Sequence, residues 1–130
     1  MLTTTRISEF ISKYKNQFPT FILESELLKY EEEGKLHEII FSNEVIGFFV
    51  LDEEKMKSLF IAEEYREYSS IILPGVYQFA KILSKGYLTI AADPNNPRTA
   101  KHALLNGFKK TDRTVQGKDR LLEIWEWRSS

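Results

Sequence analysis

Few side chains in this sequence are of the types that carry out acid–base or nucleophilic chemistry. The chain contains no cysteine, which excludes a thiol nucleophile, a disulfide framework and a zinc site built on thiolates. Its two histidines, His37 and His102, are too few and too far apart in the chain to predict a metal site. Carboxylates are the other common proton carriers, and Glu63 and Glu64 stand together directly after an apolar segment.

Composition and charge narrow the classes of protein that this sequence fits. With 130 residues, of which 42% are hydrophobic and 13% aromatic, the chain can bury a core without metals or disulfides, and we predict one domain spanning residues 1–130. A formal net charge of -1 with intermixed charges gives no basis for nucleic-acid binding. No apolar run reaches the length of a signal peptide or a membrane span, so we expect a cytoplasmic protein with no membrane partner.

The first part of the chain changes from helical to strand-like periodicity. Apolar residues at helical spacing follow Thr5, a suitable helix N-cap, and a second helix is predicted from Pro19 to a C-terminal stop at Gly34. Beyond Gly34, β-branched and aromatic residues indicate strands, and short turns at 42–44 and 52–54 predict an antiparallel meander. The predicted strands are 36–41, 45–51 and 56–62.

The second half of the chain alternates between helical and strand patterns. Proline is tolerated only in the first turn of a helix, so Pro74 places the start of the helix that ends at Gly86 near Leu73. Because a strand–helix–strand connection crosses over right-handed, strands 56–62 and 87–92 are predicted to be parallel. A helix at 98–105 and strands from Phe108 and at 121–127 complete the pattern. The predicted fold class is α/β, with a mixed antiparallel and parallel twisted sheet flanked by helices on both faces.

Two segments of the second half resemble motifs of the GNAT superfamily of acyl-CoA-dependent N-acetyltransferases. Residues 59–67, LFIAEEYRE, look like the family's fourth strand followed by the start of its pyrophosphate loop. Residues 95–112, NNPRTAKHALLNGFKKTD, resemble the family's last helix and the turn into its sixth strand, here Gly107-Phe108. The order and spacing of these segments agree with the predicted helices and strands. The resemblance therefore implies a GNAT-like acyl-CoA N-acyltransferase fold.

The resemblance implies acetyl-CoA as the cofactor and indicates which residues would hold it. The diphosphate of the cofactor would lie at a helix N-terminus, where backbone N–H groups and the helix dipole favour anions. Its pantetheine arm would pair with backbone in a gap between two strands, lined by 59–62 and 90–92. The implied cofactor-binding residues are Phe60, Ile61, Ala62, Arg66, Ser69, Ser70 and Asn96.

This sequence departs from the family pattern at positions that matter for chemistry. Ser69 and Ile71 stand where the pyrophosphate loop normally carries small residues, chiefly glycine. Ala103 stands where the family has a tyrosine as general acid, and one helical step turns the adjacent His102 by about 100°. An amine substrate also needs a base, for which the carboxylates at the end of the fourth strand are the natural candidates. The implied catalytic residues are Glu63, Glu64 and His102.

Three functions follow from the resemblance and its departures. The first is acetyl-CoA-dependent transfer of an acyl group to a primary amine of unknown identity. The second, favoured by the lost glycines and tyrosine, is a catalytically inactive GNAT-fold module that binds a protein partner, and the third is an acyl-CoA-binding regulator. Loop 63–71 distinguishes them, because amides that converge on an open cleft favour cofactor binding, whereas Tyr68 or Ile71 in that space favours the inactive module. A monomer and a homodimer paired through the last strands both remain open.

Overall fold

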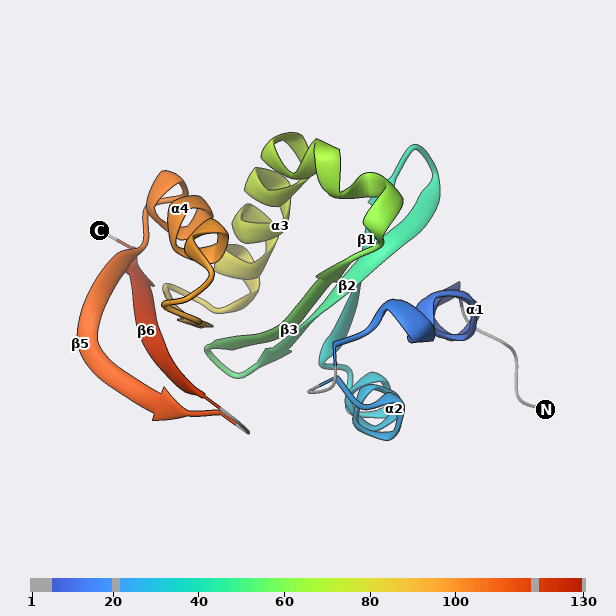
Figure 1. Cartoon of the computed structure of the whole chain (residues 1–130), viewed down its shortest axis with the longest axis horizontal. Coiled ribbons are helices and arrows are strands. Elements are labelled where there is room, and N and C mark those ends of the chain that lie inside the picture. Colours follow the sequence, from blue (N-terminus) through green and yellow to red (C-terminus); the bar gives the residue numbers. More distant parts are fainter. Residues whose placement is uncertain (1–5, 20–21, 118–119, 130) are drawn as a thin grey trace. The chain divides into compact units, whose positions relative to one another are not determined.

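The computed structural model of the chain describes residues 6–19, 22–117 and 120–129 (Figure 1). Its helices are α1 (Arg6–Tyr14), α2 (Glu24–Glu32), α3 (Ser69–Leu83) and α4 (Pro97–Leu105), with short 3-10 helices η1 (Lys15–Gln17) and η2 (Glu63–Tyr68). Its strands are β1 (Leu36–Phe41), β2 (Glu44–Asp52), β3 (Lys55–Ile61), β4 (Tyr87–Ala92), β5 (Lys109–Gln116) and β6 (Leu121–Arg128). The predicted N-cap Thr5 lies outside the described residues.

The strands form one six-stranded sheet in the order β1-β2-β3-β4-β6-β5. β1 pairs with β2, β4 with β6 and β5 with β6, all antiparallel. β3 and β4 are parallel, with Lys55 opposite Thr89 and Met56 opposite Ile90. This arrangement confirms the predicted mixed sheet and the parallel pair that the crossover helix α3 requires.

The chain divides into two compact units, each with its own buried residues. Unit 1 comprises Met1–Val50 and Ser58–Ser69, and unit 2 comprises Leu51–Lys57 and Ser70–Ser130. Single-domain organisation over residues 1–130 stays a prediction. Among the described residues, no helix combines the length and the apolarity needed to cross a bilayer.

The core of unit 1 is an aromatic cluster between the N-terminal helices and strands β2 and β3. Phe10 of α1 meets the rings of Phe48 and Phe60 edge-on, each at a centroid distance of 6.1 Å. Phe18 lies 4.8 Å from Phe60. Leu27 of α2 belongs to the same buried cluster and Tyr30 packs against it, whereas Leu23, also predicted as a core contact, is exposed; the predicted apolar stripe is confirmed in full only for α1.

β1 and β2 are joined by a two-residue hairpin turn. Ser42 and Asn43 have φ angles of 52° and 63°. Left-handed φ at both central residues defines the type I′ turn, whose twist matches that of the flanking strands. The structure therefore confirms the predicted tight turn, which ends at Glu44 as the first residue of β2.

β3 contains a left-handed residue in its interior. Ser58 has a φ of 52°, in a region that costs a residue with a side chain about 1–2 kcal/mol. A single left-handed residue within a strand is typical of a β-bulge, which bends the strand and interrupts its pairing. Ser58 follows the parallel-paired residues Lys55 and Met56 and precedes the strand end that enters η2.

Helix α3 begins earlier than the sequence predicts. It starts at Ser69 rather than near Leu73, and Pro74 lies inside it. Pro74 has no N–H to donate to the carbonyl of Ser70, four residues earlier. Both residues are exposed, so water can solvate that carbonyl and the helix continues through the proline.

Helix α3 packs in unit 2 through Lys81 and Tyr77. The Lys81 Nζ of α3 donates to the Asn106 carbonyl at the end of α4, at 2.6 Å. The same ammonium lies 5.1 Å from the ring centroid of Trp127 on β6. Tyr77 of α3 meets Phe108 at 5.4 Å, which joins the helix to the segment that precedes β5.

Gly47 sets the spacing between β2 and β3 in unit 1. A Cβ atom at this position would overlap the carbonyl oxygen of Phe60 and lie 3.1 Å from the Ile61 Cα. One residue away, the Ala62 N–H donates to the Ile46 carbonyl at 2.8 Å. The end of β3 therefore approaches β2 more closely than any side chain at position 47 allows.

We expect Gly47→Ala to destabilise the chain by about 1–3 kcal/mol, because the strand backbone must move to admit the methyl group. Gly75 in α3 is the matched control, since an added Cβ there meets nothing within 4 Å. Gly75→Ala should raise stability by about 0.5–1 kcal/mol through helix propensity. Urea unfolding measures both, and equal effects of the two substitutions would contradict the close approach at Gly47.

Candidate functional site

The residues that follow β3 form a compact 3-10 helix instead of an open loop. In η2, the Tyr65 N–H donates to the Ala62 carbonyl at 2.9 Å, and the C-cap N–H of Ser69 donates to the Arg66 carbonyl. Ala62 is buried, whereas Glu63 and Glu64 are exposed at the start of η2. The two glutamates thus stand at the end of the strand as predicted, with their carboxylates accessible to solvent.

Contacts within unit 1 fix the position of η2. The Glu63 N–H donates to the Gln17 side chain at 2.9 Å, and the Tyr65 hydroxyl donates to the Glu44 carboxylate at 2.9 Å. The Tyr68 ring lies 5.5 Å from the ring of Phe41 at the end of β1. These contacts join η2 to η1, β2 and β1.

The Arg66 side chain turns back onto the strand that precedes it. Its Nε donates to the Ile61 carbonyl at 2.9 Å, and its guanidinium lies 5.5 Å from the ring centroid of Phe60. Three of the predicted cofactor-binding residues therefore contact one another directly. The cation therefore lies beside the end of β3.

The two positions that replace family glycines differ in what their side chains do. Ser69 has helical angles of φ -56° and ψ -37°, which any residue adopts without strain. Its hydroxyl donates to the Arg66 carbonyl at 2.6 Å, so both Ser69 donors serve the chain itself. The Ile71 side chain is 68% exposed and does not fill the space within the loop. Tyr68 packs on Phe41 and is also partly exposed.

Three other predicted residues belong to unit 2. Ser70 is exposed in the first turn of α3. Asn96 is the N-cap of α4, and its side-chain oxygen accepts the Arg98 N–H at 3.3 Å. His102 lies in α4 beside Ala103, which is fully buried.

His102 favours the neutral form of its imidazole. Burial lowers its pKa below the ordinary value of 6.5, and the charges of Lys101 and Arg98 lower it further. A neutral imidazole at pH 7 accepts protons more readily than it donates them. A neutral His102 can accept a proton. It does not replace the tyrosine, the family's general acid, for which Ala103 stands in this chain.

The structure thus brings together the predicted residues Phe60, Ile61, Ala62, Glu63, Glu64, Arg66 and Ser69 in one continuous segment of unit 1. Ser70, Asn96 and His102 are in unit 2, and the roles assigned to all of these residues stay predictions. The same holds for the strand gap, because 59–62 and 90–92 belong to different units. Among the described residues, no group of three or more His, Asp or Glu side chains is arranged to hold a metal ion.

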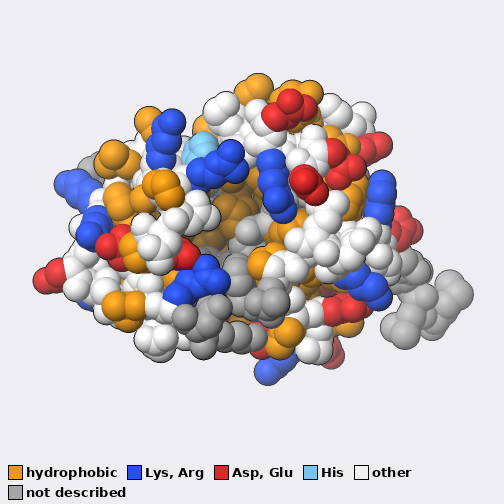
Figure 2. Space-filling view, viewed as in Figure 1, with side chains coloured by type: hydrophobic (Ala, Val, Ile, Leu, Met, Phe, Trp, Pro, Cys, Tyr) orange, Lys and Arg blue, Asp and Glu red, His pale blue; other side chains and the backbone are white. Residues whose placement is uncertain are grey.

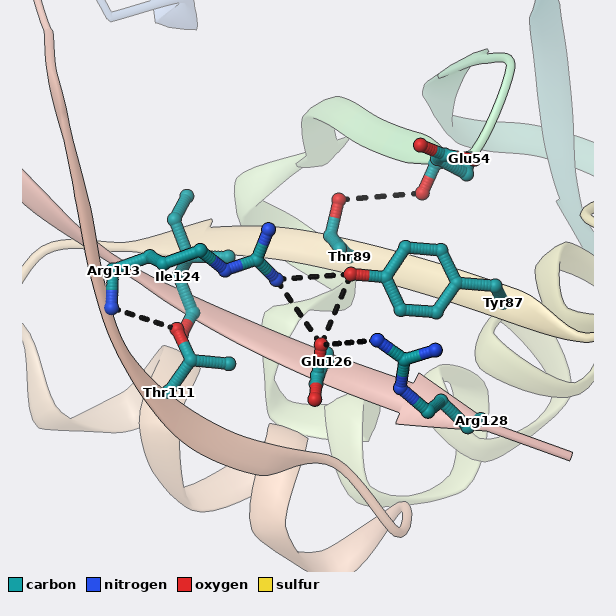
Figure 3. Close-up of polar contacts among 8 residues, drawn as sticks. All are labelled: Glu54, Tyr87, Thr89, Thr111, Arg113, Ile124, Glu126 and Arg128. Atoms are coloured by element: carbon teal, nitrogen blue, oxygen red, sulfur yellow. Dashed lines mark hydrogen bonds and ion pairs between the residues drawn. The ribbon is translucent and has the colours of Figure 1, made fainter. Parts of the chain in front are cut away.

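A second polar cluster, which the sequence analysis missed, lies on the sheet of unit 2 (Figure 3). The Tyr87 hydroxyl donates to the Glu126 carboxylate at 3.0 Å, and Arg113 Nη2 donates to both groups at 2.9 and 3.1 Å. Arg128 adds an ion pair to Glu126 at 3.5 Å and lies 4.4 Å from the centre of the Tyr87 ring. The register that pairs Tyr87 with Arg128 across β4 and β6 creates this cluster, and it cannot be read from either strand alone.

Charges of both signs are interspersed over the surface that Figure 2 shows, with hydrophobic side chains between them. Among the described residues, ion pairs such as Lys110–Glu123 at 2.9 Å and Arg120–Asp93 at 2.6 Å join charges of opposite sign. The expectation of no nucleic-acid partner stays a prediction.

No family model matches the chain, and no curated protein matches it in sequence. Its structure, however, is similar to solved structures, among them those of acetyltransferases. Ard1 from Thermoplasma volcanium has a TM-score of 0.70 at 9% identity, covering 98% of this chain and 93% of its own. A GNAT family acetyltransferase from Elizabethkingia anophelis, solved with acetyl-CoA bound, has a TM-score of 0.61 at 19% identity, covering 82% and 84%. One from Staphylococcus aureus has a TM-score of 0.61 at 16% identity, covering 95% and 90%.

These similarities extend over most of both chains in each comparison, although few residues are identical. The mixed sheet with its parallel β3–β4 pair and the crossover helix α3 is the arrangement that they share with this chain. The chain therefore has the GNAT fold. The fold class implied by the sequence motifs is confirmed.

We expect Glu126→Gln to lower thermal stability at pH 7 because Glu126 is held as a carboxylate. The Tyr87 hydrogen bond and the two neighbouring arginines lower its pKa below the ordinary 4.5. A lowered pKa in the folded chain gives stability that is present above pH 4.5 and is lost as the pH falls through the folded value. The difference in melting temperature between wild type and variant should therefore shrink in acid. A difference that stays constant from pH 7 to pH 3 would contradict the charged cluster.

Proposed function

We propose that this chain is a divergent GNAT acyltransferase that transfers an acyl group from acyl-CoA, with acetyl-CoA as the cofactor, to a primary amine. The observation that carries the proposal is the GNAT fold over nearly the whole chain, including the strand–η2–α3 segment. One neighbour with this fold was solved with acetyl-CoA bound.

The residues around the start of α3 fit the diphosphate of acyl-CoA in part. A helix of 15 residues presents partial positive charge at its N-terminus, where Ser70 is exposed. Arg66 supplies a full positive charge immediately before that terminus. Ser69 contributes little, because its N–H and hydroxyl both donate to Arg66. Arg66 of unit 1 would contact the diphosphate, and Ser70 and Asn96 of unit 2 stay the further residues that the resemblance assigns to the cofactor.

Bound acyl-CoA would supply a thioester, whose acyl group is activated toward attack by an amine. The chain would have to remove a proton from that amine, and we assign this step to Glu63 and Glu64, whose exposed carboxylates follow β3. His102, neutral at pH 7, is a further proton acceptor in unit 2. Ala103 has no ionisable group, so this chain provides no acid at that position.

A second function, a GNAT-fold module that binds a protein and does not transfer acyl groups, is favoured by two observations. Both donors of Ser69 are used within the chain, which weakens the phosphate site. Ala103 stands where the family has its general acid, and its side chain is fully buried and has no ionisable group. Binding of acyl-CoA distinguishes the two functions.

We expect acetyl-CoA to bind the wild-type chain with micromolar affinity, about -8 kcal/mol, in a calorimetric titration. Arg66→Glu should abolish measurable binding, because it reverses the charge beside the helix terminus that holds the diphosphate. Lys29→Glu is the matched control, since it makes the same change of charge at an exposed position of α2 and should bind as the wild type does. No binding to the wild type at millimolar acetyl-CoA would reject the transferase and favour the protein-binding module.

For the transfer step, we expect one of Glu63→Gln and Glu64→Gln to slow acyl transfer about 100-fold or more, because the amide cannot accept a proton. The rate is measured as release of free thiol from acetyl-CoA with a panel of primary amines. Glu67→Gln, another exposed carboxamide substitution in η2, is the control that should leave the rate unchanged. Equal rates in all three variants would remove the glutamates from the mechanism.

A further inference from the structure

The first backbone amide of η2 is capped by a side chain from a distant part of the chain. The first N–H groups of a helix have no acceptor within the helix itself. The N-cap residue of η2, Ala62, provides no side-chain hydrogen bond. Instead, the Glu63 N–H donates to the Gln17 Oε1 of η1 at 2.9 Å, across a sequence separation of 46 residues. Gln17 therefore does for η2 what a serine, threonine, asparagine or aspartate at the N-cap does for most helices.

Gln17 belongs to a packed part of unit 1. The ring of the next residue, Phe18, lies 4.8 Å from the ring of Phe60 on β3 and 5.5 Å from that of Phe48 on β2. Gln17 itself is half-buried. The packed rings hold the backbone of this segment beside the end of β3, and the hydrogen bond then fixes the backbone of Glu63. The direction in which the Glu63 side chain leaves the backbone is fixed with it.

The second candidate base, Glu64, has a cation among its neighbours. The pKa of Lys13 in α1 is raised, chiefly by its hydrogen bond with Tyr14. The negative charges of Glu64 and Glu44 raise it further. Lys13 is exposed and lies 5.1 Å from the centre of the Tyr14 ring. A primary amine reaches the protein as an ammonium ion at pH 7, and the Lys13 ammonium repels such an ion from the neighbourhood of Glu64.

We propose that Gln17 is a positioning residue, which orients Glu63 as the base of acyl transfer in preference to Glu64. This assignment rests on the proposed function and selects one of its two carboxylates. An ammonium substrate loses one proton to the Glu63 carboxylate. The neutral amine then forms its bond to the acyl carbon as the carbon–sulfur bond of the thioester breaks, and the second proton of the nitrogen passes through water to the departing sulfur.

We expect Gln17→Leu to lower kcat at least about tenfold and to leave the KM for acetyl-CoA unchanged, because only the orientation of the base is lost. The loss should vanish in the Glu63→Gln background and persist in the Glu64→Gln background, because residues that act as a unit are not additive. Asn16→Leu is the matched control. It removes the neighbouring amide side chain, which is exposed in η1, and should leave the rate unchanged.

The conservative variant Gln17→Glu separates orientation from stability. Its carboxylate keeps an oxygen that accepts the Glu63 N–H, so the rate at high pH should recover. Its negative charge beside Glu63 favours the protonated form of that base, so the acidic limb of the pH–rate profile should move to higher pH. A role of Gln17 in stability alone would not move this limb.

Amide hydrogen exchange tests the contact itself without reference to activity. In Gln17→Leu the Glu63 N–H should exchange at least about tenfold faster than in the wild type, whereas the Phe48 N–H in β2 should keep its rate. Unchanged exchange at Glu63, or a loss of rate that persists in the Glu63→Gln background, would overturn the assignment and leave the proposed function in place. A wild-type chain that binds no acetyl-CoA would remove the proposed function and the assignment together.

Discussion

The contact between the β2 and β3 backbones at Gly47 determines where the end of β3 lies. Because no side chain separates Gly47 from Phe60, the buried rings of Phe48 and Phe60 can stack at 5.7 Å in the same core. The Ala62 N–H then reaches the Ile46 carbonyl, and η2 begins at the next residue. The carboxylates that precede α3 are positioned by this chain of backbone contacts, although neither they nor η2 touches Gly47.

Two requirements restrict the sequence of helix α3, one at its buried face and one at its N-terminus. Its inner face must be apolar to cover the sheet of unit 2, where Leu88 and Ile90 of β4 are buried. Its N-terminus must stay polar and uncrowded if an anion is to approach, which the pair Ser69-Ser70 allows. Between these ends Pro74 remains inside the helix because its ring points outward and costs one hydrogen bond to an exposed carbonyl.

Periodicity and turn chemistry predicted the strands, the parallel pair and the core face of α1, because those features depend on residues close in sequence. The start of α3 was predicted wrongly, since Pro74 outweighed the apolar positions that precede it. The candidate site was predicted only as a list of residues. Whether Ser69 offers its donors to a ligand or to Arg66 depends on the 3-10 geometry of η2, and the Tyr87–Glu126 cluster depends on register across strands. Neither is encoded in local spacing.

Strand β5 ends the sheet on one side, and its residues are exposed on both faces, apart from the half-buried Thr111. It carries Lys109, Lys110, Asp112 and Arg113, and its register with β6 shifts between Lys110 and Thr114. Charged side chains and irregular backbone at a sheet edge disfavour the addition of another strand. Folded chains at high concentration are therefore protected from polymerising edge to edge, even though this strand has unpaired backbone groups along its outer side.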